Sequence, residues 1–101
     1  MSEGEKGFID GNLLQSAIDT TGVHVQTEMI IEECAELIFA LQKLKRNGGN
    51  SAEKLFNVCS EIADVKIMIA IAEKIFNQGL INEAIYAKMH RLKNKIIAGQ
   101  L

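Results

Sequence analysis

Apolar residues recur at spacings of three and four along most of the chain, which is the pattern of amphipathic helices. Four stretches carry this pattern, over residues 10–20, 23–46, 50–78 and 80–98. Asn50, followed three residues later by Glu53, predicts the start of the third helix, and Gly79 predicts its end. Because no long stretch alternates with a period of two, we expect an all-α chain that folds as an antiparallel four-helix bundle.

The turn over residues 47–50 separates the two longest stretches and is too short for anything but an antiparallel return. Residues 23–46 and 50–78 should therefore lie side by side. The chain of 101 residues is the size of one domain, in which we expect residues 1–9 to be loosely ordered. Residues 23–46 carry apolar positions on two sides, so we expect a second copy to cover one of them, in a homo-oligomer that is a dimer or a tetramer.

Two acidic pairs interrupt the apolar faces of the second and third helices. Glu61 falls at the middle of the apolar face of the third helix, and Asp64 lies on the same face three residues later. Glu33 falls inside the apolar stripe of the second helix, and Glu36 lies on its margin. The antiparallel return brings the two pairs level to within about one helical turn. We therefore expect the four carboxylates to share one site.

A site of four carboxylates requires protons or cations, because burying an unpaired carboxylate costs several kcal/mol and like charges repel. Oxygen ligands without His or thiolate favour a hard divalent ion, so we expect Glu33, Glu36, Glu61 and Asp64 to bind Mg²⁺, with Mn²⁺ as the alternative. The other interpretation is that these acids form salt bridges to Lys or Arg, or that the helix faces are less buried than the spacing indicates.

The acids at residues 32, 33, 36, 61 and 64 resemble the EExxE and ExxD motifs of the MazG-like, all-α nucleoside triphosphate pyrophosphohydrolases. The similarity covers residues 23–95. It implies hydrolysis of a nucleoside triphosphate to the monophosphate and pyrophosphate, with Mg²⁺ held by Glu33, Glu36, Glu61 and Asp64. The resemblance further implies that Glu32 is a catalytic acid beside the metal, where it helps to position water. The resemblance also implies a homo-oligomer, because such enzymes assemble their bundles across subunits.

Cations for the phosphates are expected on the fourth helix. Lys88, Arg91 and Lys95 lie at i, i+3 and i+7 on one stripe, and the segment resembles the family's C-terminal helix with its phosphate-contacting Lys. The family often has Asn four residues beyond that Lys, where this chain has Leu92. The alternative is a solvated face near a helix C-terminus, where the dipole favours cations. Lys43 and Lys66 are further candidates, whereas His24 and His90 stand alone.

Composition limits the function classes. The net charge of −2 argues against a nucleic-acid-binding domain, and charged residues interrupt every apolar stretch, which argues against a membrane span. Because residues 1–10 lack an apolar signal segment, we expect a cytoplasmic protein. Two other functions remain open: a non-enzymatic helical oligomerisation or regulatory module, and a ferritin-like di-metal protein, although the Glu-x-x-His signature of the latter is missing.

Overall fold

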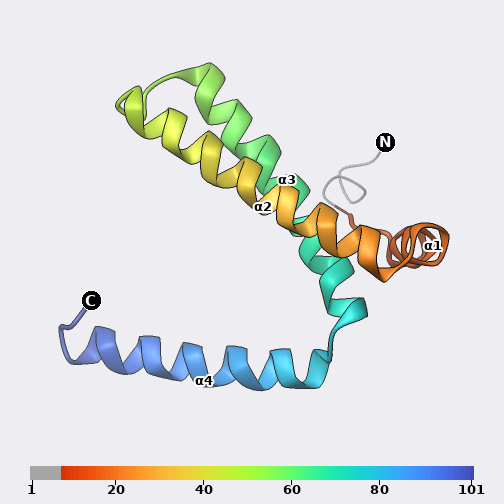
Figure 1. Ribbon diagram of the computed structural model, residues 1–101. Coiled ribbons are helices and arrows are strands. Elements are labelled where there is room, and N and C mark those ends of the chain that lie inside the picture. The colour runs from red at the N-terminus through yellow and green to blue at the C-terminus, as the bar shows by residue number, and fades with distance from the viewer. Residues whose placement is uncertain (1–7) are drawn as a thin grey trace.

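The computed structural model describes residues 8–101, which form four α-helices and no strand (Figure 1). The helices are α1 (Gly11–Thr21), α2 (Val23–Arg46), α3 (Ala52–Ile75) and α4 (Gln78–Ile97). The prediction of an all-α chain is confirmed. None of these helices is both long and apolar enough to cross a membrane. The expectation of loose order over residues 1–9 falls on residues 1–7, outside the described part, and on two residues that lead into α1.

Side-chain caps decide where the helices begin. The Ser51 hydroxyl accepts a hydrogen bond of 3.2 Å from the N–H three residues later, which makes Ser51, and not Asn50, the N-cap of α3. The Asn77 side chain accepts a 3.0 Å bond from Leu80 N–H and caps α4. Gly79 therefore lies in the first turn of α4, and the prediction that it ends the preceding helix is wrong, since α3 already stops at Ile75.

The α2–α3 hairpin is the packed body of the molecule (Figure 1). Its two helices run antiparallel and make the most extensive contact between any two elements. The turn contains Gly48 and Gly49, whose φ angles of 73° and 78° lie in the left-handed region that favours glycine. Among residues 8–101, the buried apolar side chains all come from this hairpin: Ala40, Val58, Met68 and Ile71. The predicted pairing of the second and third helices is confirmed.

The short α1 packs against both members of the hairpin. Gln26, near the start of α2, is 2% exposed, and its Nε2 donates a 2.9 Å hydrogen bond to the Thr21 hydroxyl at the end of α1. This bond links the two helices across Gly22, whose φ of 90° allows the sharp change of direction between them.

The fourth helix departs from the expected bundle. After the extended Phe76, α4 points away from the hairpin, and within residues 8–101 it contacts α3 but neither α1 nor α2 (Figure 1). None of its side chains is buried. A single chain therefore does not close a four-helix bundle. The helical period of α4 predicts an apolar face, but it does not specify what that face packs against.

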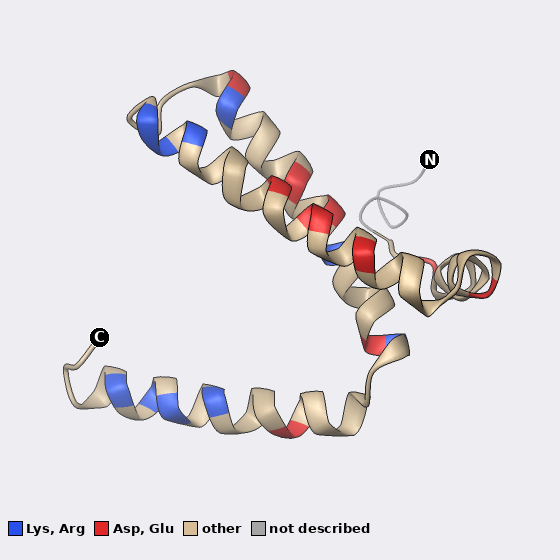
Figure 2. Cartoon of the chain, viewed as in Figure 1, with Lys and Arg blue, Asp and Glu red and all other residues tan. Residues whose placement is uncertain are grey.

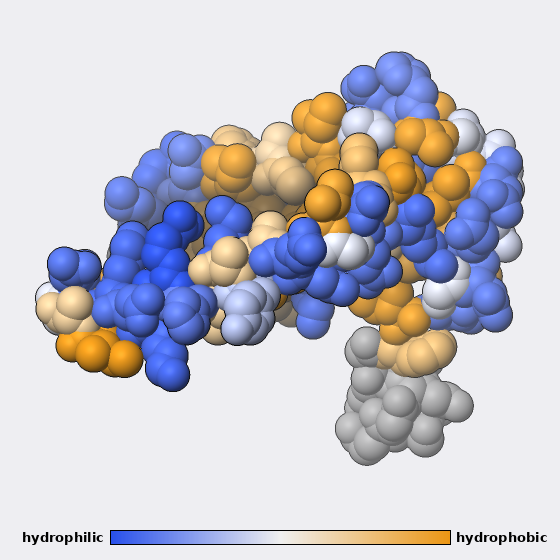
Figure 3. Space-filling model, turned by 90° about the horizontal axis from the view of Figure 1, so that it is seen from below, coloured by the Kyte–Doolittle hydropathy of each residue, from blue (hydrophilic) through white to orange (hydrophobic). Residues whose placement is uncertain are grey.

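The open shape leaves an unusually large surface. The solvent-accessible area is 7793 Å², whereas a compact chain of 11.1 kDa exposes about 5,700 Å². The radius of gyration is 16.8 Å, against about 13 Å for a compact domain of this length. Figure 3, which views the molecule from the α4 side, shows apolar side chains at the surface between charged ones.

Candidate metal centre

Three carboxylates meet in the middle of the α2–α3 hairpin. Glu33 comes from α2, and Glu61 and Asp64 come from successive turns of α3. Each offers one oxygen, and these three oxygens all lie within 4.8 Å of one another. Figure 2 shows the acidic positions gathered along this part of the hairpin. The structure thus brings together three of the four acids that the sequence predicts to share a site, and we call these three the carboxylate cluster.

The cluster combines buried and exposed parts. Glu33 and Glu61 are half-buried, whereas Asp64 is exposed. The Oε2 atom of Glu61 is buried and has no hydrogen-bond partner among the described residues. A buried carboxylate oxygen without a donor is unfavourable, and it is stabilised when a proton or a cation approaches it. The exposed side at Asp64 leaves a path by which a ligand from solvent can reach the cluster.

The pKa of the Glu33 carboxyl is raised above its ordinary value of 4.5. The largest cause is partial desolvation, followed by the negative charges of Asp64, Glu61, Glu36 and Glu32. The other four acids of the expected motif therefore all act on the Glu33 carboxyl. A divalent cation would reverse this effect, because it favours the charged form of each carboxylate that it contacts.

The raised pKa of Glu33 predicts how the metal-free protein responds to pH. The folded state holds the Glu33 proton more tightly than the unfolded state does, so the contribution of this group to stability falls as pH rises above 4.5 towards its folded pKa. The Glu33→Gln variant lacks this loss. Urea unfolding in EDTA should show the variant gaining stability relative to the wild type as pH rises above 4.5, until Glu33 is ionised in the folded state as well, after which the difference stays constant. A growing advantage of the wild type over the same range would contradict the prediction.

Glu36 and Glu32 lie beside the cluster and not within it. Both are exposed on α2, and both line a shallow pocket with Ala35 and Phe39. Glu36 also lines a second pocket together with Glu61. This second pocket lies closer to the closed end of the hairpin than the cluster does. Their positions at the edge of the cluster suit carboxylates that face substrate or water.

The cations expected from α4 are not near the cluster in a single chain. Lys88, Arg91 and Lys95 are exposed on α4, which contacts neither α2 nor the middle of the hairpin (Figure 2). Lys43 lies closer, in the pocket that contains Glu36 and Glu61. Lys66 faces a different pocket, formed with Phe8, Ile9, Ala63 and Ile67.

The two histidines stay outside the acidic group. His24 and His90 are both exposed, and the ring of His90 stacks on Tyr86 with 6.3 Å between the ring centres. Neither is a member of the carboxylate cluster. The donor set is therefore made of oxygen alone.

Two residues near the cluster were missed by sequence reasoning. Lys54 and Asn57 line the same pocket as Glu61, on the same side of α3. Their spacing contains the signal, since they precede Glu61 by seven and four residues and therefore share its helix face. The sequence did not single them out because the inner face of the third helix was identified from its apolar residues and not from its polar ones.

The residues present fit a hard divalent cation. Three carboxylates at 4.8 Å or less offer the oxygen ligands that Mg²⁺ prefers, and the buried Glu61 oxygen lacks any other partner among residues 8–101. Mg²⁺ usually keeps several waters and binds through one or two protein carboxylates together with substrate phosphates, so an open, incomplete ligand set is suitable. No protein-family model, curated protein or solved structure matches the chain.

Proposed function

We propose that this protein is a Mg²⁺-dependent nucleoside triphosphate pyrophosphohydrolase, which converts a nucleoside or deoxynucleoside triphosphate to the monophosphate and pyrophosphate. The observation that carries the proposal is the carboxylate cluster of Glu33, Glu61 and Asp64, with its unpartnered buried oxygen. The spacing of the acids, which resembles the MazG-like motifs, supports the same function. Mn²⁺ is the alternative ion.

In this proposal, each acid has a distinct task. Glu33, Glu61 and Asp64 hold the cation, which when bound supplies charge neutralisation to the phosphate oxygens. Glu36, at the edge of the cluster, would be the fourth ligand of that cation. Glu32 orients the attacking water and accepts its proton. The water oxygen forms a bond to the α-phosphorus, the bond from that phosphorus to the bridging oxygen breaks, and pyrophosphate leaves with the electron pair.

The test is a panel of nucleoside and deoxynucleoside triphosphates incubated with the purified protein and Mg²⁺, with pyrophosphate and monophosphate measured separately. Equal amounts of the two products, abolished by EDTA, are expected. Orthophosphate as the only product, or no product at all, would contradict the proposal. Oxidation of added Fe²⁺ with a coloured di-iron product would instead support the ferritin-like alternative.

We further propose that the working form is a homo-oligomer, a dimer or a tetramer. The chain exposes roughly 2,000 Å² more than a compact monomer would, which is the scale of an obligate interface. Ile31 and Ile38 on α2 are 59% and 58% exposed, and Ile85 and Met89 on α4 are 53% and 59% exposed. A second copy that packs on these faces would also bring Lys88, Arg91 and Lys95 towards a carboxylate cluster, where they would contact phosphate.

Sedimentation at micromolar concentration should therefore give a species at least twice 11.1 kDa. Introducing a charge into the apolar face of α4 with Ile85→Glu should shift the protein to the monomer, because a buried unpaired charge costs several kcal/mol. Ala87→Glu is the matched control, since residue 87 is exposed on the opposite side of α4. A wild-type species of 11 kDa, or equal effects of the two variants, would contradict this prediction.

The exposed apolar face of α4 also favours a second candidate function, a non-enzymatic helical oligomerisation or regulatory module. In such a protein, the acids would have no catalytic task. The two functions separate in one comparison: Glu61→Gln should remove pyrophosphate release without changing the sedimentation behaviour if the protein is an enzyme. A module would assemble in the same way and release no pyrophosphate in either form.

A further inference from the structure

A pocket next to the carboxylate cluster joins acidic and basic side chains. It lies between α2 and α3, towards the closed end of the hairpin. Six side chains form its polar and aromatic lining: Glu36, Phe39, Lys43, Lys54, Asn57 and Glu61. Glu61 belongs to both the pocket and the cluster, so the two sites are continuous.

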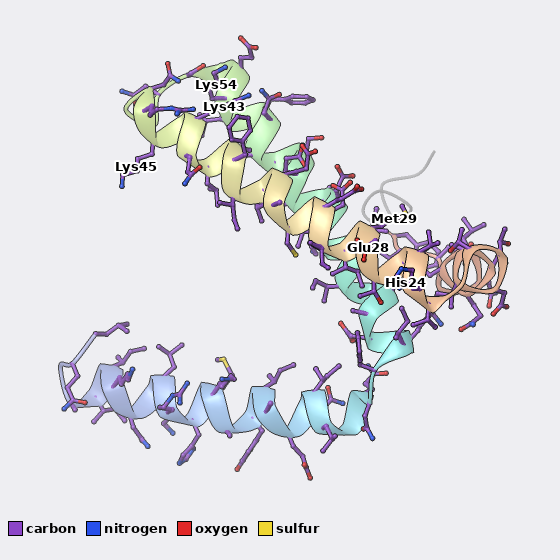
Figure 4. The ribbon with its side chains drawn as sticks, viewed as in Figure 1. His24, Glu28, Met29, Lys43, Lys45 and Lys54 are labelled. Carbon is purple, nitrogen blue, oxygen red and sulfur yellow. The ribbon has the colours of Figure 1, made fainter. Side chains whose placement is uncertain are left out.

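The lining follows from two matching spacings. Along α2, Glu36, Phe39 and Lys43 lie at i, i+3 and i+7, and along α3, Lys54, Asn57 and Glu61 do so as well. Because the helices run antiparallel, the two acids meet at one end of the pocket and the two lysines at the other. The pocket thus has an acidic end at the cluster and a basic end towards the tip of the hairpin, where Figure 4 shows Lys43 and Lys54.

The two lysines have different surroundings. The Nζ atom of Lys43 lies 4.3 Å from the centre of the Phe39 ring, a cation–π contact that fixes the ammonium group beside the pocket. Lys54 lies in the first turn of α3 and is half-buried. The neighbouring Lys45 differs, because it is exposed and does not line this pocket (Figure 4).

We propose that this pocket binds the diphosphate portion of the substrate, with Lys43 and Lys54 contacting the β- and γ-phosphate oxygens and Asn57 donating a hydrogen bond to them. The inference rests on the proposed function. A bound diphosphate is stabilised by a metal cation at one end and by positively charged side chains at the other. The acidic end of the pocket would hold the cation, and the basic end supplies the two lysines. The nucleoside then extends past the cluster, away from the hairpin tip.

The charge distribution favours this direction over the reverse one. The leaving diphosphate carries more negative charge than the α-phosphate, so it gains most from the lysines. Beyond the cluster, away from the hairpin tip, α2 presents Glu28, an exposed acid that would repel a phosphate chain (Figure 4). The N-terminus of α3 adds a favourable dipole at the basic end.

The test measures the affinity for inorganic pyrophosphate by calorimetry in the presence of Mg²⁺. Lys43→Ala and Lys54→Ala should each weaken pyrophosphate binding about tenfold or more, the loss expected for a charge-assisted contact. Lys54→Arg should retain most of the affinity, and Lys45→Ala should leave it unchanged. Binding of a nucleoside monophosphate should change less than about twofold in all four variants.

Metal binding without phosphate distinguishes this inference from a structural role. If the lysines only screen Glu36 and Glu61, their removal changes apo stability and metal affinity but leaves pyrophosphate affinity at the wild-type value, which would overturn the inference. The inference expects Mg²⁺ affinity to stay constant or rise in Lys43→Ala and Lys54→Ala, since removing a nearby positive charge favours the cation.

The outcomes also separate the inference from the proposed function. If the wild type hydrolyses triphosphates and the lysine variants match it in KM and pyrophosphate affinity, the proposed function stands. The assignment of the pocket to the diphosphate is then overturned. Wild-type protein that releases no pyrophosphate from any triphosphate overturns the function. In that case, pyrophosphate binding that depends on Lys43 and Lys54 still supports a diphosphate site, and its absence overturns both.

Discussion

The Glu61→Gln variant should lose pyrophosphate release by at least about a hundredfold and still melt, in EDTA, at or above the temperature of the wild type. Glu61 shares the cluster with Glu33 and Asp64, and loss of groups that support a bound metal costs about 10–100-fold even when they do not touch it. Removing its charge relieves repulsion in the metal-free protein. The glutamine side chain has nearly the same shape as glutamate. Its NH₂ group can donate hydrogen bonds to the neighbouring carboxylates of the cluster.

This result is checked with thermal melts and a pyrophosphate assay on the same preparations. Glu28→Gln is the matched control, because it makes the same change at an exposed position of α2 outside the cluster. If Glu61 instead belonged to a structural ion pair, its removal would cost about 3–5 kcal/mol. A large fall in the apo melting temperature with full retention of activity would therefore reject the metal centre.

Mg²⁺ should raise the melting temperature of the wild type by about 11–22 °C when present at roughly a hundred times its dissociation constant. Binding at that ratio stabilises the folded state by about 2.7 kcal/mol, and each kcal/mol shifts the transition of a chain of this size by about 4–8 °C. The double variant Glu33→Gln/Asp64→Asn should respond little, because it retains one carboxylate of the cluster.

Ionic strength needs its own control in this measurement. Salt screens repulsion between the clustered carboxylates, so NaCl at matched ionic strength also stabilises the protein to some degree. Specific binding predicts a Mg²⁺ shift well above the NaCl shift. Equal shifts in Mg²⁺ and NaCl would show that the cluster holds no ion.

Periodicity predicted the hairpin because local and tertiary signals agree there. The apolar stripe of α2 ends at a turn with two glycines, and both the bounds Val23–Arg46 and the antiparallel return follow from that arrangement. The i, i+3 spacing of Glu61 and Asp64 places both on the side that faces α2, so their meeting with Glu33 was predictable as well.

The remaining features depend on information that periodicity does not contain. The start of α3 is decided by one hydrogen bond, to Ser51 and not to its neighbour Asn50, although both residue types are good caps. The direction of α4 depends on the backbone of Phe76 and on the Asn77 cap. Its apolar face indicates burial and leaves the partner open, which is why the packing of that helix could not be predicted from the sequence.

In the proposed homo-oligomer, the separation of α4 from the hairpin would tie the resistance of the chain to proteolysis to its concentration. An unpacked helix with Lys88, Arg91, Lys93 and Lys95 in exposed positions offers several adjacent cleavage sites to a trypsin-like protease. Assembly is second order in protein concentration, whereas cleavage of a free chain is first order. In the proposed homo-oligomer, dilute chains would therefore be cleaved faster than concentrated ones, in which assembly covers α4.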